Sequence, residues 1–346
     1  MSAPQPQLDR PIHLLAITRK PNSASFEHRI VRYTEGLADR DIKLTIRVLP
    51  SSVRGQWRLL AESRRFDGVW WQRHLVTPWI AMRMHRDRPP IVFDFDDPLV
   101  YSARDGRRRW TRQSRFSRTL RRCTAALAAS ETLAALARPY CSWVIELPMA
   151  IDVPIQPPPR NQMNDQCLQL LWLGSATTQP YLNLIREPLI ALGHRRHDVK
   201  LRLVTHQPMT FGQLEVDFRP WSPSEQAMAL QECDVGLCPM PDTVWTQGKC
   251  PYKVLQYMAH AIPWVGSAVG ENRVMAGSGE QEPRGLCAST NEEWLQMLLR
   301  LIEDVRLRAA IGHRAHQYVA RHHRREVLVN RLSQFWRKLI VGRSNA

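Results

Sequence analysis

A helix, a strand and a glycine-containing loop follow one another between Thr246 and Asn272, and this segment constrains the fold more than any other. Helical periodicity runs up to Pro263, and a short apolar strand and the loop follow it. Lys249 and Lys253 stand at the start of the helical run, and residues four apart lie on one helix face. Two ammonium groups beside the free N–H groups of a helix N-terminus predict an anion site suited to a diphosphate.

The residues around these lysines form a recurring pattern: Lys253, Gln256, Met258, Ala259, Pro263 and Val265. This pattern resembles the donor-binding motif of family 4-type (group 1) glycosyltransferases, which transfer a sugar from a nucleotide-sugar. Many members carry two glutamates separated by seven residues, where this chain has Gly248 and Gln256. Some branches of the family read GKCxxKxLQYMA, as this chain does, so the departure indicates a subtype.

The resemblance implies an α/β protein of GT-B fold, with two Rossmann-like, doubly wound domains facing a cleft. It implies a retaining glycosyltransferase that moves a sugar from a nucleotide-diphosphate sugar to a saccharide or lipid-linked acceptor in cell-envelope polysaccharide or glycolipid synthesis. The nucleotide-sugar is a co-substrate, and no cofactor or metal is expected. Because the acidic pair is absent, the alternative is a non-catalytic GT-B protein that binds a nucleotide-sugar or organises an assembly.

The resemblance also assigns the donor contacts. They fall on Gly174, Ser175, Thr178, Gln256, Gly270, Glu271 and Asn272. In the family, the turn after the first strand of the second domain faces the donor phosphates, and here no basic residue occurs between Gly174 and Arg186. Hydroxyl and backbone N–H groups of this turn would therefore contact the phosphates, while the two lysines supply the charge. The amide oxygen of Gln256 would accept hydrogen bonds from the ribose.

Charged residues follow the predicted strands of the first half. Arg73 and His74 come directly after one strand, and residues at the carboxyl ends of parallel strands face the ligand in doubly wound domains. Arg73 is predicted to contact acceptor or phosphate, whereas His74 is interpreted as structural or solvated. Ser23 or Ser25 caps the helix after the first strand. Arg29 in that helix either assists the donor phosphates or lies on the surface.

An acidic cluster closes the next strand, where Asp94 and Asp96 point to one face and Asp97 begins the turn. These carboxylates can bind a divalent cation, accept hydrogen bonds from acceptor hydroxyls, take the acceptor proton, or pair with arginines downstream. The resemblance disfavours the cation. The predicted catalytic set is Lys249, Lys253, Asp97 and Arg73.

Positive charge concentrates in the first half of the chain. Residues 1–152 contain 26 basic and 15 acidic residues, a net charge of +11 out of +16 for the whole chain. Nine of these arginines lie between Arg104 and Arg122, and five of them share one helical stripe: Arg108, Arg112, Arg115, Arg118 and Arg122. The segment suits an anionic membrane surface, and an Arg-rich genome is the alternative source of the excess. Nucleic acid is not expected, because no recognised nucleic-acid motif accompanies the stripe.

Composition sets the remaining expectations. The 346 residues suffice for two α/β domains. We predict an acceptor-side domain over 1–152, a linker over 153–167, a nucleotide-sugar-binding domain over 168–324 and a helix near the interdomain seam over 325–346. No apolar run reaches membrane-spanning length, no signal peptide is apparent, and the seven cysteines form no CxxC pair. We therefore expect a cytoplasmic protein, peripheral at the inner face of the membrane.

Overall fold

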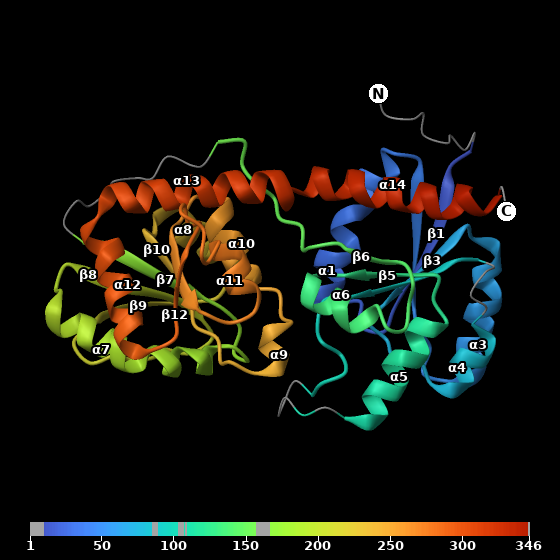
Figure 1. Ribbon diagram of the computed structural model, residues 1–346, viewed down its shortest axis with the longest axis horizontal. Helices are drawn as coiled ribbons and strands as arrows, with labels where there is room; N and C mark the ends of the chain where they lie inside the picture. Colours follow the sequence, from blue (N-terminus) through green and yellow to red (C-terminus); the bar gives the residue numbers. More distant parts are fainter. Residues whose placement is uncertain (1–9, 85–88, 103–106, 108, 157–166, 345–346) are drawn as a thin grey trace. The chain divides into compact units, whose positions relative to one another are not determined.

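The computed structural model describes residues 10–84, 89–102, 107, 109–156 and 167–344 (Figure 1). The chain divides into two compact units. Unit 1 comprises Met1–Ala150, Gly248–Cys250 and Arg325–Ala346, and unit 2 comprises Ile151–Gln247 and Pro251–Arg324. Each unit is built around one six-stranded sheet.

The sheet of unit 1 is parallel throughout, in the order β2-β1-β3-β4-β5-β6. Its strands are β1 (Ile12–Thr18), β2 (Ile42–Val48), β3 (Gly68–Gln72), β4 (Ile91–Phe95), β5 (Ala125–Ala128) and β6 (Val144–Glu146). The central strands β3 and β4 are buried along their whole length, as parallel strands covered on both faces must be. The strand order reverses between β1 and β3, and doubly wound domains bind ligands at such switch points.

Helices cover both faces of this sheet. They are α1 (Ala24–Arg29), η1 (Val31–Tyr33), α2 (Thr34–Ala38), α3 (Val53–Glu62), η2 (Ser63–Arg65), α4 (Pro78–Arg83), α5 (Trp110–Arg121), α6 (Glu131–Ala137) and α14 (Arg325–Ser344). One core holds Phe93 and Phe95 against Phe116 of α5. On the other face, the ring centroids of Trp70 and Trp336 lie 6.0 Å apart, so the last helix belongs to the core of unit 1.

Unit 2 has a second parallel sheet, in the order β12-β11-β10-β7-β8-β9. Its strands are β7 (Leu168–Leu173), β8 (Val199–Thr205), β9 (Glu215–Pro220), β10 (Val235–Cys238), β11 (Trp264–Ser267) and β12 (Leu286–Ala288). This is the dinucleotide-binding strand order, and its switch point lies between β7 and β10. The short apolar strand predicted before the glycine-containing loop is β11.

The helices of unit 2 are η3 (Gln179–Ile185), α7 (Arg186–Arg195), α8 (Pro223–Glu232), α9 (Val244–Gln247), α10 (Tyr252–Ala259), α11 (Glu271–Ala276), α12 (Asn291–Glu303) and α13 (Val305–His322). The 3₁₀ helix η3 leads directly into α7, which begins at Arg186. Pro188 then lies in the first turn of α7, where an α-helix accommodates proline. Helix α10 lies against the strands, where the Tyr257 hydroxyl donates to the backbone oxygens of Leu171 and Leu237.

The predicted α/β class with doubly wound parallel sheets is confirmed in both units. Residues 157–166 of the predicted linker, and residues 103–106 and 108 of the arginine-rich segment, lie outside the described residues. No helix in the described ranges combines the length and apolar character needed to span a membrane.

Candidate functional site

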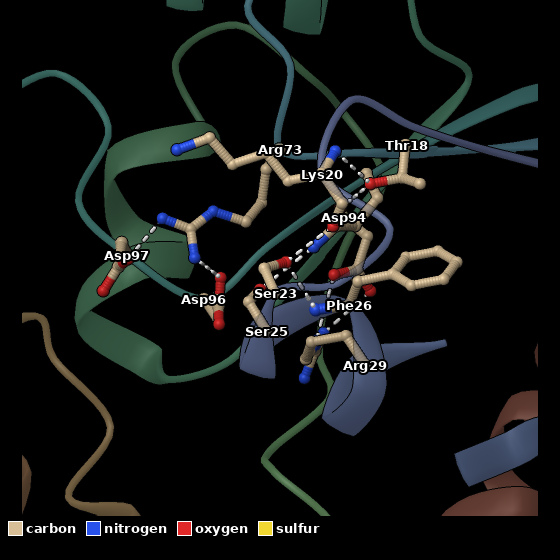
Figure 2. Close-up of polar contacts among 11 residues, drawn as sticks. Thr18, Lys20, Ser23, Ser25, Phe26, Arg29, Arg73, Asp94, Asp96 and Asp97 are labelled. Carbon is tan, nitrogen blue, oxygen red and sulfur yellow. Dashed lines mark hydrogen bonds and ion pairs between the residues drawn. The ribbon is translucent and has the colours of Figure 1, made fainter. Parts of the chain in front are cut away.

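The switch point of unit 1 is held by a chain of buried polar contacts between β1, β3 and α1 (Figure 2). The Thr18 hydroxyl donates to Oε1 of Gln72 at 2.8 Å, and Nε2 of Gln72 donates to the Ser25 hydroxyl at 2.9 Å. Ser23 caps α1 by accepting from the N–H of Phe26. Of the two serines proposed as caps, Ser23 therefore has this role, and Ser25 links α1 to the sheet.

A buried ion pair joins α1 to the end of β4. Nε and Nη2 of Arg29 donate to the two carboxylate oxygens of Asp94 at 3.0 and 2.9 Å, and both side chains are fully buried. Nη1 of Arg29 donates to the backbone oxygen of Leu147 at 2.5 Å. Burial raises the pKa of Asp94, and the Arg29 charge opposes the shift. The prediction of a surface position for Arg29 is wrong, because its side chain is fully buried and its guanidinium is enclosed with Asp94.

Arg73 holds the other two carboxylates of the acidic cluster. Its Nη1 lies 3.0 Å from Oδ1 of Asp96, and its Nη2 donates to Asp97. Figure 2 shows the guanidinium extended between the two aspartates. The backbone of Arg73 has φ 57, a conformation that costs a non-glycine residue energy and persists only where surrounding contacts fix it. The hydrogen bond from the backbone N–H of Arg73 to the backbone oxygen of Asp94, at 2.8 Å, is one such contact.

Asp97 lies among charged groups of both signs. Burial raises the pKa of Asp97, Arg73 opposes the shift, Asp96 adds to it, and Lys249 again opposes it. A carboxyl with a raised pKa takes a proton more readily than an ordinary aspartate. Of the alternatives left open for the acidic cluster, pairing with arginines is observed, and the partners among the described residues include Arg29 and Arg73, which precede the cluster in the sequence.

His74 is neutral over a wide pH range. Burial, followed by the charges of Arg19 and Arg115, lowers its pKa to about 4. The indole N–H of Trp71 donates to the backbone oxygen of His74 at 2.7 Å, which fixes the backbone here.

In unit 2, the turn after β7 lies at the switch point, as the resemblance implied for the phosphate-facing turn. The Ser175 side chain is exposed, and its hydroxyl lies 2.8 Å from that of Thr177. Thr178 differs from its predicted role: its N–H and its hydroxyl both donate to the backbone oxygen of Ser175, at 3.0 and 3.2 Å. Those donors close the turn, so Ser175 is the side chain of this set best placed for a ligand.

The two lysines of the motif do not share a helix face. Helix α10 begins at Tyr252, one residue after Pro251, so Lys249 precedes the helix. Pro251 accounts for the difference, because a proline disfavours the helical conformation in the residue before it. Lys249 groups with unit 1, whereas Lys253 lies in the first turn of α10 in unit 2. Nζ of Lys253 sits 4.4 Å from the ring centroid of Trp172, on β7.

The glycine-containing loop also differs in part from its prediction. Helix α11 follows Gly270, whose φ of 47 and close approach to Gln247 require glycine: a Cβ there would lie 2.4 Å from the Gln247 backbone oxygen. The N–H of Asn272 donates to the oxygen of Val269, and its side-chain amide donates to the oxygen of Ser267 at 3.0 Å. Asn272 therefore fixes the loop and offers no backbone donor to a ligand.

The remaining predicted donor residue, Gln256, is buried on α10, with 8% of its surface exposed. At the position of the first family glutamate, a Cβ on Gly248 would lie 3.1 Å from Leu133 and 3.2 Å from Pro98. These apolar neighbours leave little room for a glutamate, which is consistent with glycine at this position.

Helix α5 carries the described part of the arginine-rich stripe. Arg112 and Arg122 are exposed, whereas Arg115 turns inward and donates to the backbone oxygen of Leu75 at 2.5 Å. The stripe is therefore only partly a solvated face. Within the described ranges, no group of three or more His, Cys, Asp or Glu side chains is arranged to hold a metal ion.

The two parallel sheets and their switch points define a two-unit α/β protein with ligand-binding edges. No protein-family model matches this sequence, and the search of curated proteins found no match. The chain is similar in structure to sucrose-phosphate synthase from Thermosynechococcus elongatus, with a TM-score of 0.72, 14% identity, and coverage of 96% of this chain and 100% of that one.

Two further solved structures give the same result. HepE from Anabaena, in complex with UDP-glucose, matches with a TM-score of 0.69 and 12% identity, over 94% of this chain and 99% of that one. A glycosyltransferase from Rickettsia africae matches with a TM-score of 0.70 and 10% identity, over 95% and 98%. These neighbours are GT-B glycosyltransferases, so the predicted GT-B fold is confirmed.

Sequence reasoning missed three residues that organise these edges: Thr18, Gln72 and Trp172. Thr18 and Gln72 are the last residues of buried parallel strands, and that position was the available signal. Trp172 looked like an ordinary core residue in an apolar strand.

Proposed function

We propose that this chain is a retaining glycosyltransferase of the family 4 type that moves a sugar from a nucleotide-diphosphate sugar to a saccharide or lipid-linked acceptor. The acceptor chemistry belongs to cell-envelope polysaccharide or glycolipid synthesis. The reaction needs no cofactor and no metal, since cationic side chains neutralise the leaving diphosphate. The protein acts in the cytoplasm, peripheral at the inner face of the membrane.

The observation that carries the proposal is the position of the donor motif. The segment that enters α10 follows the carboxyl end of β10, and the loop before α11 follows that of β11, so both lie at the same edge of the unit 2 sheet as the turn after β7. Doubly wound domains bind nucleotides at this edge, beside the strand-order reversal. The fold is that of GT-B glycosyltransferases, and the HepE structure contains UDP-glucose.

Each donor residue then has a role in the proposal. Lys253, with Lys249, neutralises the charge that grows on the diphosphate as it leaves, which is the main electrostatic demand of the reaction. Gln256 accepts hydrogen bonds from the ribose hydroxyls. Ser175 and the backbone N–H groups of Gly270 and Glu271 contact phosphate or sugar, and Gly174 opens the turn that presents Ser175, while its own N–H donates to the backbone oxygen of Val204.

The acceptor side of the proposal lies in unit 1. Asp97 takes the proton of the attacking hydroxyl, a task suited to a carboxyl whose pKa burial raises. Arg73 positions Asp97 through its direct contact with that carboxylate. Arg112 of α5 and Arg122, the residue directly after this helix, are exposed; they bind anionic lipid headgroups and bring a lipid-linked acceptor within reach.

Release of nucleoside diphosphate, measured with and without acceptor, tests the proposal. A panel of nucleotide-sugars is first screened by thermal shift, and the best donor is then assayed with saccharide and lipid-linked acceptors. Lys253→Ala should lower turnover by about 10²-fold or more, as loss of one preorganised charge-stabilising group does. Lys200→Ala is the matched control, because this lysine of unit 2 forms an ion pair with Glu215, an exposed residue of β9.

Two outcomes would contradict parts of this assignment. Equal turnover by Lys253→Ala and wild type would remove Lys253 from the mechanism. Nucleotide-sugar binding without acceptor-dependent release would favour the alternative, a non-catalytic GT-B binding or assembly protein. Gly248 and Gln256 favour that alternative, since they stand where many relatives carry glutamates.

A further inference from the structure

Trp172 connects two parts of the proposed donor site in unit 2. It is the penultimate residue of β7 and is fully buried. Its indole ring lies over Gly174, just after the end of the strand. A Cβ added to Gly174 would lie only 2.7 Å from Cη2 of the indole. The face of the same ring lies 4.4 Å from Nζ of Lys253. One side chain therefore contacts both the turn after β7 and the lysine of α10.

An aromatic face is well suited to hold a cation that must bind an anion. The ring quadrupole attracts the ammonium, most strongly for tryptophan and where water is excluded. The indole carries no net charge, so this contact fixes the ammonium without cancelling its charge. The lysine side chain has a flexible four-carbon stem. If its ammonium is already held in place, ligand binding costs less side-chain conformational entropy.

We propose that Trp172 is a positioning residue that holds the Lys253 ammonium at the carboxyl end of β7 for the diphosphate of the nucleotide-sugar. The inference rests on the proposed function and adds a residue that the donor motif does not contain. It also explains Gly174: the indole occupies the space that any side chain at this position would need.

Trp172 also belongs to the apolar core of unit 2, with Leu170, Leu203 and Leu237. Variants must therefore separate positioning from packing. Trp172→Phe keeps an aromatic face, and Trp172→Met removes the face while filling much of the space. Trp294→Leu is the packing control, because Trp294 is a buried tryptophan of the same core on α12.

The experiment measures nucleotide affinity by calorimetry, with UDP, GDP, ADP and dTDP as probes and the matching nucleosides as controls. For the diphosphate that binds wild type, Trp172→Met should raise Kd about three- to thirtyfold, the range of one desolvated cation–π contact. Trp172→Phe should stay within about threefold of wild type, since phenylalanine retains a weaker cation–π contact. Nucleoside affinity should not change in any variant, and Trp294→Leu should lower the melting temperature without altering Kd.

A second background tests whether Trp172 acts through the lysine. In Lys253→Gln, adding Trp172→Met should leave the Kd of the diphosphate unchanged, and a further loss of affinity would overturn the proposal. Wild-type affinity in Trp172→Met would overturn it as well. If no diphosphate binds the wild type, the proposed function and this role of Trp172 are both overturned. This outcome is distinguishable from failure of the Trp172 role alone, in which the wild type binds a diphosphate and Trp172→Met binds it equally well. Where Trp172→Met does not fold, Trp172→Leu carries the same expectation.

Discussion

The buried pair between Arg29 and Asp94 should be the most sensitive electrostatic contact in unit 1. Both side chains are fully buried and meet through two hydrogen bonds of 3.0 and 2.9 Å. We expect Asp94→Asn, which keeps the size of the side chain and removes its charge, to destabilise unit 1 strongly. The guanidinium would remain enclosed and would keep neutral acceptors, the amide oxygen of the new asparagine and the backbone oxygen of Leu147, but it would lose the negative charge that now lies directly against it.

The magnitude follows from the burial of the pair. Removing one partner of a buried ion pair leaves an uncompensated charge and costs about 3–5 kcal/mol. This corresponds to a rise of roughly 10²- to 10⁴-fold in the population of the opened unit. Replacing both partners by apolar residues, as in Arg29→Met with Asp94→Leu, removes the desolvation penalty together with the attraction. The double variant should therefore be far more stable than Asp94→Asn.

Thiol labelling measures this effect in each unit separately, which matters because a two-unit chain need not unfold in one step. Cys123 in unit 1 and Cys233 in unit 2 are both free and buried. When closing is faster than labelling, the alkylation rate reports the free energy of opening. Asp94→Asn should accelerate labelling of Cys123 by the factor above and leave Cys233 almost unchanged.

An exposed pair with the same geometry provides the matched control. Arg138 donates to both carboxylate oxygens of Glu131 at 2.5 and 2.7 Å, and both side chains are largely exposed. Glu131→Gln should leave Cys123 labelling nearly unchanged, because water replaces the lost partner. Similar labelling rates in Asp94→Asn and Glu131→Gln, or a double variant as unstable as Asp94→Asn, would refute burial as the cause.

The remaining predictions concern pH and lipid. Burial and the charges of Arg19 and Arg115 lower the pKa of His74 from 6.5 to about 4, so the unfolded chain binds a proton that the folded unit excludes. Unit 1 should lose stability as pH falls from about 6.5 towards 4, and His74→Asn should flatten that loss in the same labelling assay; an unchanged slope would contradict this. Arg112→Gln with Arg122→Gln should weaken flotation with phosphatidylglycerol vesicles by about tenfold or more, at roughly 1 kcal/mol per arginine. Equal binding of wild type to neutral vesicles would contradict the lipid contact.

The fold was predictable where short-range signals agree. The strand predicted before the acidic cluster is observed as β4, and the doubly wound sheets that the resemblance implied are present in both units. The weaker elements were missed: β9 is half exposed and carries three charged residues, and β12 has only three residues. Strand length and burial, rather than residue type, decided which strands were visible in the sequence.

The site was predictable by position and less so by contact. Strand ends located Arg73 and the acidic cluster correctly, because a parallel sheet gathers its carboxyl ends at one edge. The partners were not predictable, since Arg29 and Asp94 are 65 residues apart and meet only through the fold. The predicted placement of Lys249 on the helix is wrong for a local reason: Pro251 disfavours the helical conformation in the residue before it, so α10 begins only at Tyr252.

The two units hold their cations in different ways, and this difference is the reason for assigning them different tasks. In unit 1, Arg29 and Arg73 lie directly against carboxylates. Their positive charges are balanced there, and they hold Asp94, Asp96 and Asp97 in place. In unit 2, the contacts of Lys253 include an aromatic face, and this contact orders the ammonium without itself neutralising the charge. A diphosphate is bound best by a cation that is held in place and still charged. The ordered carboxylates of unit 1 suit hydroxyl groups and protons instead, which is the chemistry that an acceptor brings.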